Sequence, residues 1–356
     1  MKNYHLTKVL VTAASIVFAF LLGEIAARLL LPAWFHPSDT HASRTVPGYE
    51  PPINVYDPEI GWVLSPGSIK SHHILVPDVT YSIDHGERLT SLQPPSGPLV
   101  VATGCSFTFG QSVPDQDTWP WLLQERLPDY HVVNVAAMGY GTDQALLAAE
   151  REIGRFPGKV RTVILGFADF QIDRNRCPQS WLSKICPYGK PRFVLNSTGV
   201  QYKEQMRVWS LGSVTDSLID RSFLLSSISD LVTDRIVHRI ERHDGGRQLT
   251  VALITDFARR FQARGSKLVV VVLPHFLDQS AQSKEDRAFV TGQLRAAGVP
   301  TLVMDIPRLP DGRLPPRGFT VGGHPNRQYS LLLADQLVKF LNTLSTPQES
   351  SGKSRH

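Results

Sequence analysis

Cysteine is scarce in this sequence, which has three in 356 residues: Cys105, Cys177 and Cys186. Structural zinc sites use closely spaced pairs of cysteine and histidine. The last two cysteines are too far apart for such a pair, and no histidine lies beside them. The adjacent His72 and His73 lack a carboxylate or third histidine spaced to complete a metal site. We therefore interpret both histidines as surface residues and expect no metal.

Charge is also sparse. Charged residues make up 19% of the chain, and 37 basic against 32 acidic residues leave a net charge of +5. The basic residues form no block with interleaved aromatic residues, so we expect no nucleic-acid binding. A G-x-G-x-x-G fingerprint is missing too, because Gly104 and Gly110 do not form one, and this argues against a dinucleotide-binding protein.

The long stretch without charge lies near the N-terminus, from Val9 to Leu22, and apolar character resumes over Ile25–Leu31. With this continuation the stretch approaches the ~20 residues that a membrane span requires. We interpret residues 9–31 as a transmembrane signal anchor. The positive flank then keeps residues 1–8 in the cytoplasm, and everything after the anchor lies outside it, in the periplasm or the extracellular space.

Two other interpretations of this segment fit less well. A cleaved signal peptide needs a small-residue cleavage site of A-x-A type, and no clean one follows. An amphipathic surface helix needs a charged or strongly polar face, which Val9–Leu22 lacks.

Export also bears on Cys177 and Cys186, which lie in a Pro-flanked loop. In an oxidising compartment they are candidates for a disulfide, and the alternative is two free thiols.

The rest of the chain divides by its pattern into three parts. Residues 32–97 are rich in Pro, Gly, Ser and His, which is typical of an extended linker with short strands and turns that packs on the main domain. Residues 98–344 alternate apolar strands with helical patterns, and an insertion interrupts them over about residues 171–244. The polar tail, residues 345–356, is expected to be disordered.

The alternation predicts an α/β fold of three layers around a five-stranded parallel sheet. Near-continuous Val, Ile and Leu strands separated by helices are typical of a parallel sheet covered on both faces, here of flavodoxin-like type. The expected strands are Leu99–Thr103, His131–Val135, Val160–Phe167, Lys267–Leu273 and Thr301–Ile306. The expected helices are Asp117–Leu127, Thr142–Arg155, Arg247–Arg264, Lys284–Ala297 and Asn326–Leu344.

Ser106 occupies the most informative position. The stretch L-V-V-A-T-G-C-S-F-T-F-G, residues 99–110, is an apolar strand that feeds into a glycine-flanked serine and then a helix. This places the serine at the carboxyl edge of the sheet, where ligand chemistry collects, with free backbone N–H groups close by. Ser106 is therefore a candidate nucleophile. The alternative is that it only caps the helix, since serine is a preferred cap.

Three blocks of the sequence together resemble the SGNH (GDSL) hydrolases over about residues 99–344. G-C-S-F-T-F-G is similar to the first block, V-V-N-V-A-A-M-G-Y-G to the second, and G-G-H-P-N-R-Q-Y to the last. The resemblance implies that Ser106 is the nucleophile and His324 the general base. It also implies an oxyanion hole formed by the N–H groups of Ser106 and Gly139, acyl esters as substrates, and no cofactor.

The sequence departs from the family pattern at three places. Cys105 stands where an aspartate is common, but that residue is not the nucleophile. Cys105 itself is the less favoured nucleophile, because small buried cysteines are common. Ala168 replaces an asparagine that would donate to the oxyanion. Polar residues nearby that could support the site are Asp169, Gln171 and Asn175. A charged Asp169 beside an oxyanion would be unfavourable, so we expect it to orient a neighbour.

The third departure concerns the acid of the triad. It normally lies two or three residues before the histidine, and those positions hold Gly322 and Val321. A backbone carbonyl could orient His324 and give a Ser-His dyad, or a more distant residue such as Asp305 or Asp311 could supply the carboxylate. Loss of the acid lowers the rate of a triad greatly without abolishing it.

These observations favour an extracytoplasmic serine esterase or O-acyltransferase of SGNH type, anchored to the membrane by its N-terminal helix. The expected substrates are acyl esters, acetyl esters above all, with an O-acylated glycan as one target. The alternative is a catalytically degenerate member that binds a glycan or an envelope assembly partner. The missing aspartate and asparagine support that alternative, and the joint presence of Ser106, Gly139 and His324 speaks against it.

Overall fold

The computed structural model describes residues 2–30, 48–73, 76–176, 190–206, 222, 224–225, 245–275, 280–307 and 318–345. Contacts divide the chain into two compact units. One comprises Met1–Arg44 and Val208–His243, and the other comprises Thr45–Arg207 and Asp244–His356. The loop with Cys177 and Cys186 and the tail after residue 345 lie outside the described residues, so the predicted disulfide and the predicted disorder stay predictions.

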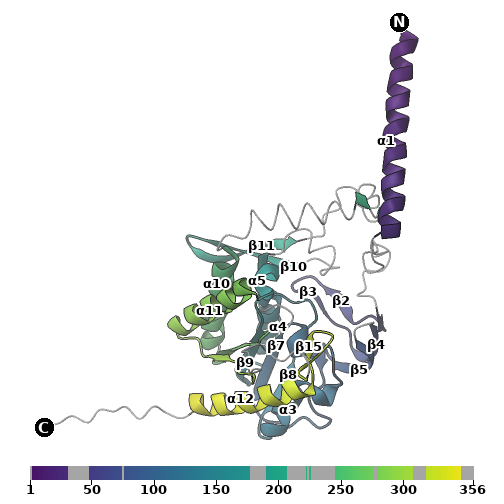
Figure 1. Cartoon of the computed structure of the whole chain (residues 1–356). Helices are drawn as coiled ribbons and strands as arrows, with labels where there is room; N and C mark the ends of the chain where they lie inside the picture. Colours follow the sequence, from purple (N-terminus) through teal and green to yellow (C-terminus); the bar gives the residue numbers. More distant parts are fainter. Residues whose placement is uncertain are drawn as a thin grey trace, which may run out of the picture. The chain divides into compact units, whose positions relative to one another are not determined.

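The first unit contains helix α1 (Lys2–Leu30), drawn in purple in Figure 1. Large apolar side chains such as Ile16, Phe18 and Leu22 are exposed on it. Within this unit the Glu24 carboxylate accepts hydrogen bonds from the Ser222 hydroxyl at 2.8 Å and from the Leu224 N–H at 3.0 Å. Among the described residues, no helix has both the length and the hydropathy of a membrane span. A helix forms where the signal anchor was predicted, but the anchor itself is not confirmed.

Five parallel strands form the centre of the second unit, in the order β8-β7-β9-β12-β13. Their bounds are β7 Leu99–Gly104, β8 His131–Asn134, β9 Val160–Phe167, β12 Lys267–Val272 and β13 Thr301–Val303. This confirms the predicted five-stranded flavodoxin-like core. The strand order reverses between β7 and β9, and ligands of such sheets bind at the carboxyl ends of the strands beside that switch point.

The sheet is larger than predicted, because four antiparallel strands continue it beyond β8 to a total of nine. The added strands are β1 (Tyr49–Glu50), β4 (Gly67–His73), β5 (Val76–Asp84) and β6 (Glu87–Arg88), while β2 (Asn54–Asp57) and β3 (Gly61–Leu64) form a separate hairpin. The region read as a linker and packing segment is thus largely part of the sheet from residue 49 onward. β1 and β6 are only two residues long, and β4 and β5 alternate buried and more exposed residues, so none of them has the long apolar run of a buried parallel strand.

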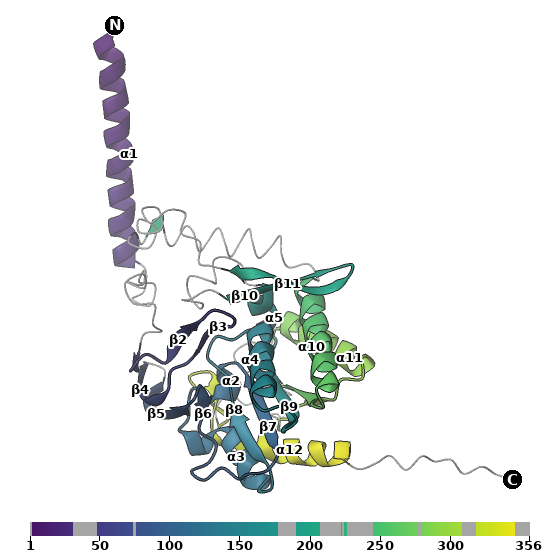
Figure 2. The ribbon, with the colours of Figure 1, turned by 180° about the vertical axis from the view of Figure 1, so that it is seen from behind.

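Helices cover both faces of the central sheet (Figures 1 and 2). α3 (Trp119–Arg126) and α12 (Arg327–Ser345) contact each other on one face. α4 (Thr142–Arg155), α10 (Gly245–Ala263) and α11 (Ala281–Ala296) contribute to the core cluster of the other face. The shorter helical elements are α2 (Ser106–Phe109), η2 (Asp115–Asp117) and α5 (Gln171–Arg176).

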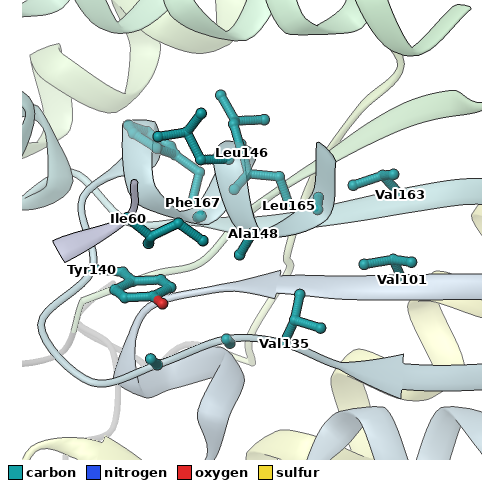
Figure 3. Packing of buried hydrophobic residues seen from close by; sticks show 14 of the residues in the cluster. Ile60, Val101, Val135, Tyr140, Leu146, Ala148, Val163, Leu165 and Phe167 are labelled. Carbon is teal, nitrogen blue, oxygen red and sulfur yellow. The ribbon is translucent and has the colours of Figure 1, made fainter. Parts of the chain in front are cut away.

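The larger core cluster lies between α4 and the sheet. Figure 3 shows Leu146 and Ala148 of α4 near Leu165 and Phe167 of β9, all of them buried. The cluster extends into the antiparallel strands through buried residues such as Trp62. The N-terminal strands are therefore part of the folded unit that carries the site.

The predicted insertion contains a hairpin that the sequence pattern did not indicate. It comprises β10 (Lys190–Asn196) and β11 (Gly199–Met206). A second short hairpin, β14 (Thr320–Val321) with β15 (His324–Pro325), precedes α12. His324 of the second hairpin contacts Ser106, and Lys190 of the first pairs with Asp143 of α4, as described below.

Candidate active site

Ser106 lies at the predicted position, where β7 ends and α2 begins, and it is 4% exposed. The turn before it requires glycine at position 104. Gly104 has φ +152°, and a Cβ there would lie 2.4 Å from Thr108 Oγ1 and 2.8 Å from the Gly166 carbonyl. Since any larger residue would push the turn away from β9, this glycine fixes where the serine is presented.

His324 reaches the same edge of the sheet on the β14–β15 hairpin. The turn of this hairpin is Gly322-Gly323, with φ +54° and +80°, and two positive φ angles are typical of a type I′ turn. The Ser112 hydroxyl donates to the Val321 carbonyl at 2.8 Å, which ties the hairpin to the segment after α2. The sequence thus folds a tight, anchored turn directly before the histidine.

The two side chains meet. His324 Nε2 lies 3.0 Å from Ser106 Oγ, and His324 Nδ1 lies 3.2 Å from the Gly322 carbonyl oxygen. A carbonyl oxygen can only accept a hydrogen bond, so we assign the ring proton to Nδ1. Nε2 is then the acceptor for the serine hydroxyl, which is the tautomer that a general base requires. Among the alternatives left open by the sequence, this geometry favours the dyad with a backbone carbonyl.

Of the two carboxylates considered for the triad, only Asp305 lies among the described residues. Asp305 is exposed, and its backbone N–H and C=O are hydrogen-bonded to the Gln336 side chain at 2.9 Å and 2.6 Å. Asp311 lies outside the described residues. Across the described part of the chain, no group of three His, Cys, Asp or Glu could hold a metal ion.

The two backbone amides predicted to form the oxyanion hole have no acceptor among the described residues. Tyr140 N–H donates to the Ala137 carbonyl at 3.4 Å, so Gly139 is the third residue of a turn, and its φ of +81° is typical of type II. Within the described residues, neither the Ser106 N–H nor the Gly139 N–H donates to a protein acceptor. Free backbone donors beside a nucleophile are what the oxyanion of acyl transfer needs.

An aromatic cluster that the sequence did not reveal surrounds the dyad. The Phe107 ring contacts the rings of His324, His275 and Phe170 at centroid distances of 5.5, 5.9 and 5.3 Å. The Arg174 guanidinium lies 4.5 Å from the Phe170 ring centroid and donates to the Tyr140 carbonyl at 3.2 Å. His275 and Phe170 follow the ends of β12 and β9, and this position at the carboxyl edge was the available signal.

The two residues predicted to support the site act through neighbouring elements. Asp169 accepts hydrogen bonds from Ser283 and, at 2.9 Å, from Arg287, and it thereby ties α11 to the end of β9. Asn175 accepts from the Thr142 N–H at 2.7 Å and donates to Thr250 at 2.8 Å, so it holds the start of α4 directly after the loop with Gly139.

A buried ion pair underlies the same loop. Lys190 of β10 and Asp143 of α4 are 1% and 0% exposed, and their charged atoms are 2.6 Å apart. Burial raises the pKa of Asp143, and the Lys190 ammonium opposes that rise. Gly141 fits over the pair because a Cβ there would lie 2.5 Å from Asp143 Oδ1. The inserted hairpin thus helps to fix the start of α4.

Comparison with known proteins gives a weak but uniform likeness. No protein-family model and no curated protein matches the chain. Among solved structures it is similar to a lipolytic protein of the G-D-S-L family from Desulfitobacterium hafniense DCB-2, with 12% identity, 68% of this chain and 99% of that chain covered, and a TM-score of 0.40. It is also similar to a GDSL-like lipase from Bacteroides thetaiotaomicron VPI-5482, with 12% identity, 69% and 89% coverage, and a TM-score of 0.40. An acetyl xylan esterase shares 10% identity over 68% of this chain and 98% of that chain, with a TM-score of 0.40. At these values an activity has to be argued from the residues of the site.

Proposed function

We propose that this protein is a serine ester hydrolase or O-acyltransferase of SGNH type. The observation that carries the proposal is the 3.0 Å contact of Ser106 Oγ with His324 Nε2, together with the bond from His324 Nδ1 to the Gly322 carbonyl. A serine hydroxyl is a weak nucleophile until a base accepts its proton. Here the base lies at hydrogen-bond distance and in the required tautomer.

In the first half of the reaction, His324 Nε2 takes the Ser106 proton while Oγ forms a bond to the ester carbonyl carbon. The carbonyl π electrons move to the oxygen, and the N–H groups of Ser106 and Gly139 donate to that oxyanion. Loss of one such donor typically costs ~3 kcal/mol of transition-state stabilisation. When the tetrahedral centre collapses, the ester C–O bond breaks and the leaving alkoxide takes the proton from His324.

In the second half, water or an acceptor hydroxyl gives its proton to His324 Nε2 and attacks the acyl-enzyme carbonyl. Collapse then breaks the bond to Ser106 Oγ, which recovers the proton. Water yields the free acid, whereas a sugar hydroxyl yields a new ester. Buried Phe107 and half-buried Phe170 and His275 form an apolar wall beside the His324 ring, which suits a short acyl group. We therefore propose acetyl esters as the substrates. The acyl donor would be an O-acylated glycan, or the acceptor would be a glycan hydroxyl.

Labelling with a fluorophosphonate, alongside hydrolysis of p-nitrophenyl acetate, tests the proposal on the full-length chain. We expect wild type to be labelled at Ser106, Ser106→Ala to be unlabelled, and His324→Gln to react at least 100-fold more slowly. Ser68→Ala is the matched control, because Ser68 is an exposed serine on β4. A folded wild-type protein that is neither labelled nor active would refute the enzyme proposal and favour a glycan-binding role.

We further propose that the protein is anchored in a membrane by residues 9–31, with the catalytic unit on the extracytoplasmic side. The support is the charge-free run Val9–Leu22 behind a basic flank. Without protease, the protein should sediment with the membrane fraction. Protease added to intact cells whose outer membrane or wall has been removed should degrade the catalytic unit. Recovery of the intact chain in the soluble fraction would refute the anchor.

A further inference from the structure

We propose that Trp62 is a positioning residue that sets the direction of the Gly139 N–H. This inference rests on the proposed function, in which that N–H binds the oxyanion. Trp62 lies on β3, in the hairpin that precedes the parallel sheet, and is fully buried. The proposal makes the N-terminal hairpin part of the catalytic unit.

Two hydrogen bonds clamp Trp62 to the turn with Gly139. The Trp62 indole N–H donates to the Met138 carbonyl at 3.1 Å, and the Tyr140 hydroxyl donates to the Trp62 carbonyl at 2.7 Å. The two rings are in contact at a centroid distance of 5.6 Å, and Tyr140 is 1% exposed. The Trp62 side chain thus holds the backbone of the turn at position 138, and the Tyr140 side chain of the turn holds the backbone of Trp62.

The first of these bonds controls a peptide orientation. The Met138–Gly139 peptide is trans, so its C=O and its N–H point in opposite directions. Holding the carbonyl toward Trp62 therefore holds the Gly139 N–H away from Trp62. In the turn formed by Ala137–Tyr140, this peptide is the central one, and the type I and type II forms differ by a flip of that peptide.

Glycine makes that flip inexpensive. Gly139 has φ +81° in the type II form, and a type I turn would place it near −90°, which glycine adopts as readily. The backbone alone therefore does not select the form in which the N–H faces away from Trp62. The indole bond does, because a flipped carbonyl would leave a buried indole N–H without its acceptor, which is unfavourable.

Further contacts from the same strands hold the turn in place. The Tyr49 hydroxyl donates to Met138 Sδ at 3.4 Å, and Gln144 Nε2, at the start of α4, donates to the Ile60 carbonyl at 2.9 Å. Figure 3 shows Ile60 beside Tyr140 at this end of the core. These contacts place the turn, whereas, among the bonds of the described residues, only that of Trp62 acts on the Met138–Gly139 peptide.

Trp62→Phe tests the proposal, with Trp119→Phe as the matched control. Both tryptophans are at most 1% exposed, so both changes remove the same volume from a core. Trp119 Nε1 has no hydrogen-bond partner among the described residues, so only the change at Trp62 removes a hydrogen bond. With p-nitrophenyl acetate and the full-length chain, we expect Trp62→Phe to lower kcat about 10- to 100-fold with KM within threefold. Trp119→Phe should keep kcat within threefold.

Tyr140→Phe provides a second variant, which removes only the bond to the Trp62 carbonyl and should lower kcat about three- to tenfold. The pH–rate midpoint should not move in either variant, because His324 and its partners are untouched. Equal kcat in Trp62→Phe and Trp119→Phe, or kcat unchanged in Tyr140→Phe where Trp62→Phe does not fold, would overturn the positioning role. An unlabelled wild type would instead refute the proposed function, so the two failures are distinguishable.

Discussion

Removal of Lys190 should expose how strongly the inserted hairpin is tied to the catalytic unit. Lys190 Nζ is 2.6 Å from Asp143 Oδ2 and also donates to the Arg174 carbonyl at 2.5 Å, and both charged side chains are almost completely buried. In Lys190→Met the carboxylate of Asp143 would keep its burial and lose its counter-charge. Breaking a buried pair in this way costs about 3–5 kcal/mol of unfolding free energy.

The loss should depend on pH, with a sign fixed by the direction of the pKa shift. Burial already raises the pKa of Asp143 above 3.8, and without the ammonium it should rise further. A carboxyl with a raised folded-state pKa binds a proton more readily in the folded state, so stability falls as the pH rises from its unfolded pKa through its folded one. Lys190→Met should therefore be closer to wild type at pH 5 than at pH 8.

Urea unfolding followed by circular dichroism measures both effects, with the double variant Asp143→Leu/Lys190→Met as the control. An apolar pair of similar volume should recover most of the stability, because neither charge is left buried alone. A loss below about 1 kcal/mol for Lys190→Met, or a double variant that loses the sum of the single losses, would refute the reasoning.

Three further outcomes are expected. Burial and the nearby Glu152 raise the pKa of Glu87 from 4.5 to about 7, so its contribution to stability falls between those pH values. Glu87→Gln should abolish that slope in urea titrations and stabilise the protein at pH 8 by up to about 3 kcal/mol, and an unchanged slope would contradict this. Gly323→Ala, at φ +80°, should lose about 1–2 kcal/mol. Gly265→Ala should lose as much, because Gly265 has φ +79° and open space around it. Of these two variants, only Gly323→Ala should also lower kcat. Equal kcat values in Gly323→Ala and Gly265→Ala would show that the turn does not place His324. Asp305→Asn should keep kcat within twofold in the same ester assay, and a fall of 100-fold or more would restore a carboxylate to the triad.

The parallel core was predictable because each of its strands carries its own signal. β7 is buried throughout and β9 is buried from Val163 onward, and the bounds of both agree with the expected ones to within a residue. The antiparallel strands gave no comparable signal, since β1 and β6 are two residues long and gain their stability from pairing partners distant in sequence. The hairpin formed by β10 and β11 pairs locally, but its strands are rich in polar residues and carry no long apolar run.

The site was predictable to the extent that its residues end strands. Ser106 was a candidate because an apolar strand and a glycine precede it at the carboxyl edge of the sheet, and His324 was a candidate because its block resembles the last block of the SGNH hydrolases. The groups that orient them could not be predicted from the sequence. Every residue has a backbone carbonyl, so no residue type marks the one that binds His324, and Trp62 lies 76 positions from the carbonyl to which its indole N–H donates. Short-range sequence patterns predict where a functional residue lies in the fold, but they do not identify the distant group that orients its side chain.

A backbone carbonyl stabilises a charged His324 less than a carboxylate would, and the rigid turn before His324 offsets part of that loss. A carboxylate does two things for a catalytic histidine, since it fixes the tautomer and stabilises the imidazolium that forms. The Gly322 carbonyl can do the first, because it accepts only from a protonated Nδ1, but its dipole compensates a full positive charge only in part. Orientation must then carry more of the catalysis, and the structure supplies it through a turn with two positive φ angles and a bond from Ser112 to Val321. On this reasoning the rigid backbone of the hairpin carries part of the orientation of His324, and its two glycines contribute to the base through the turn that they form.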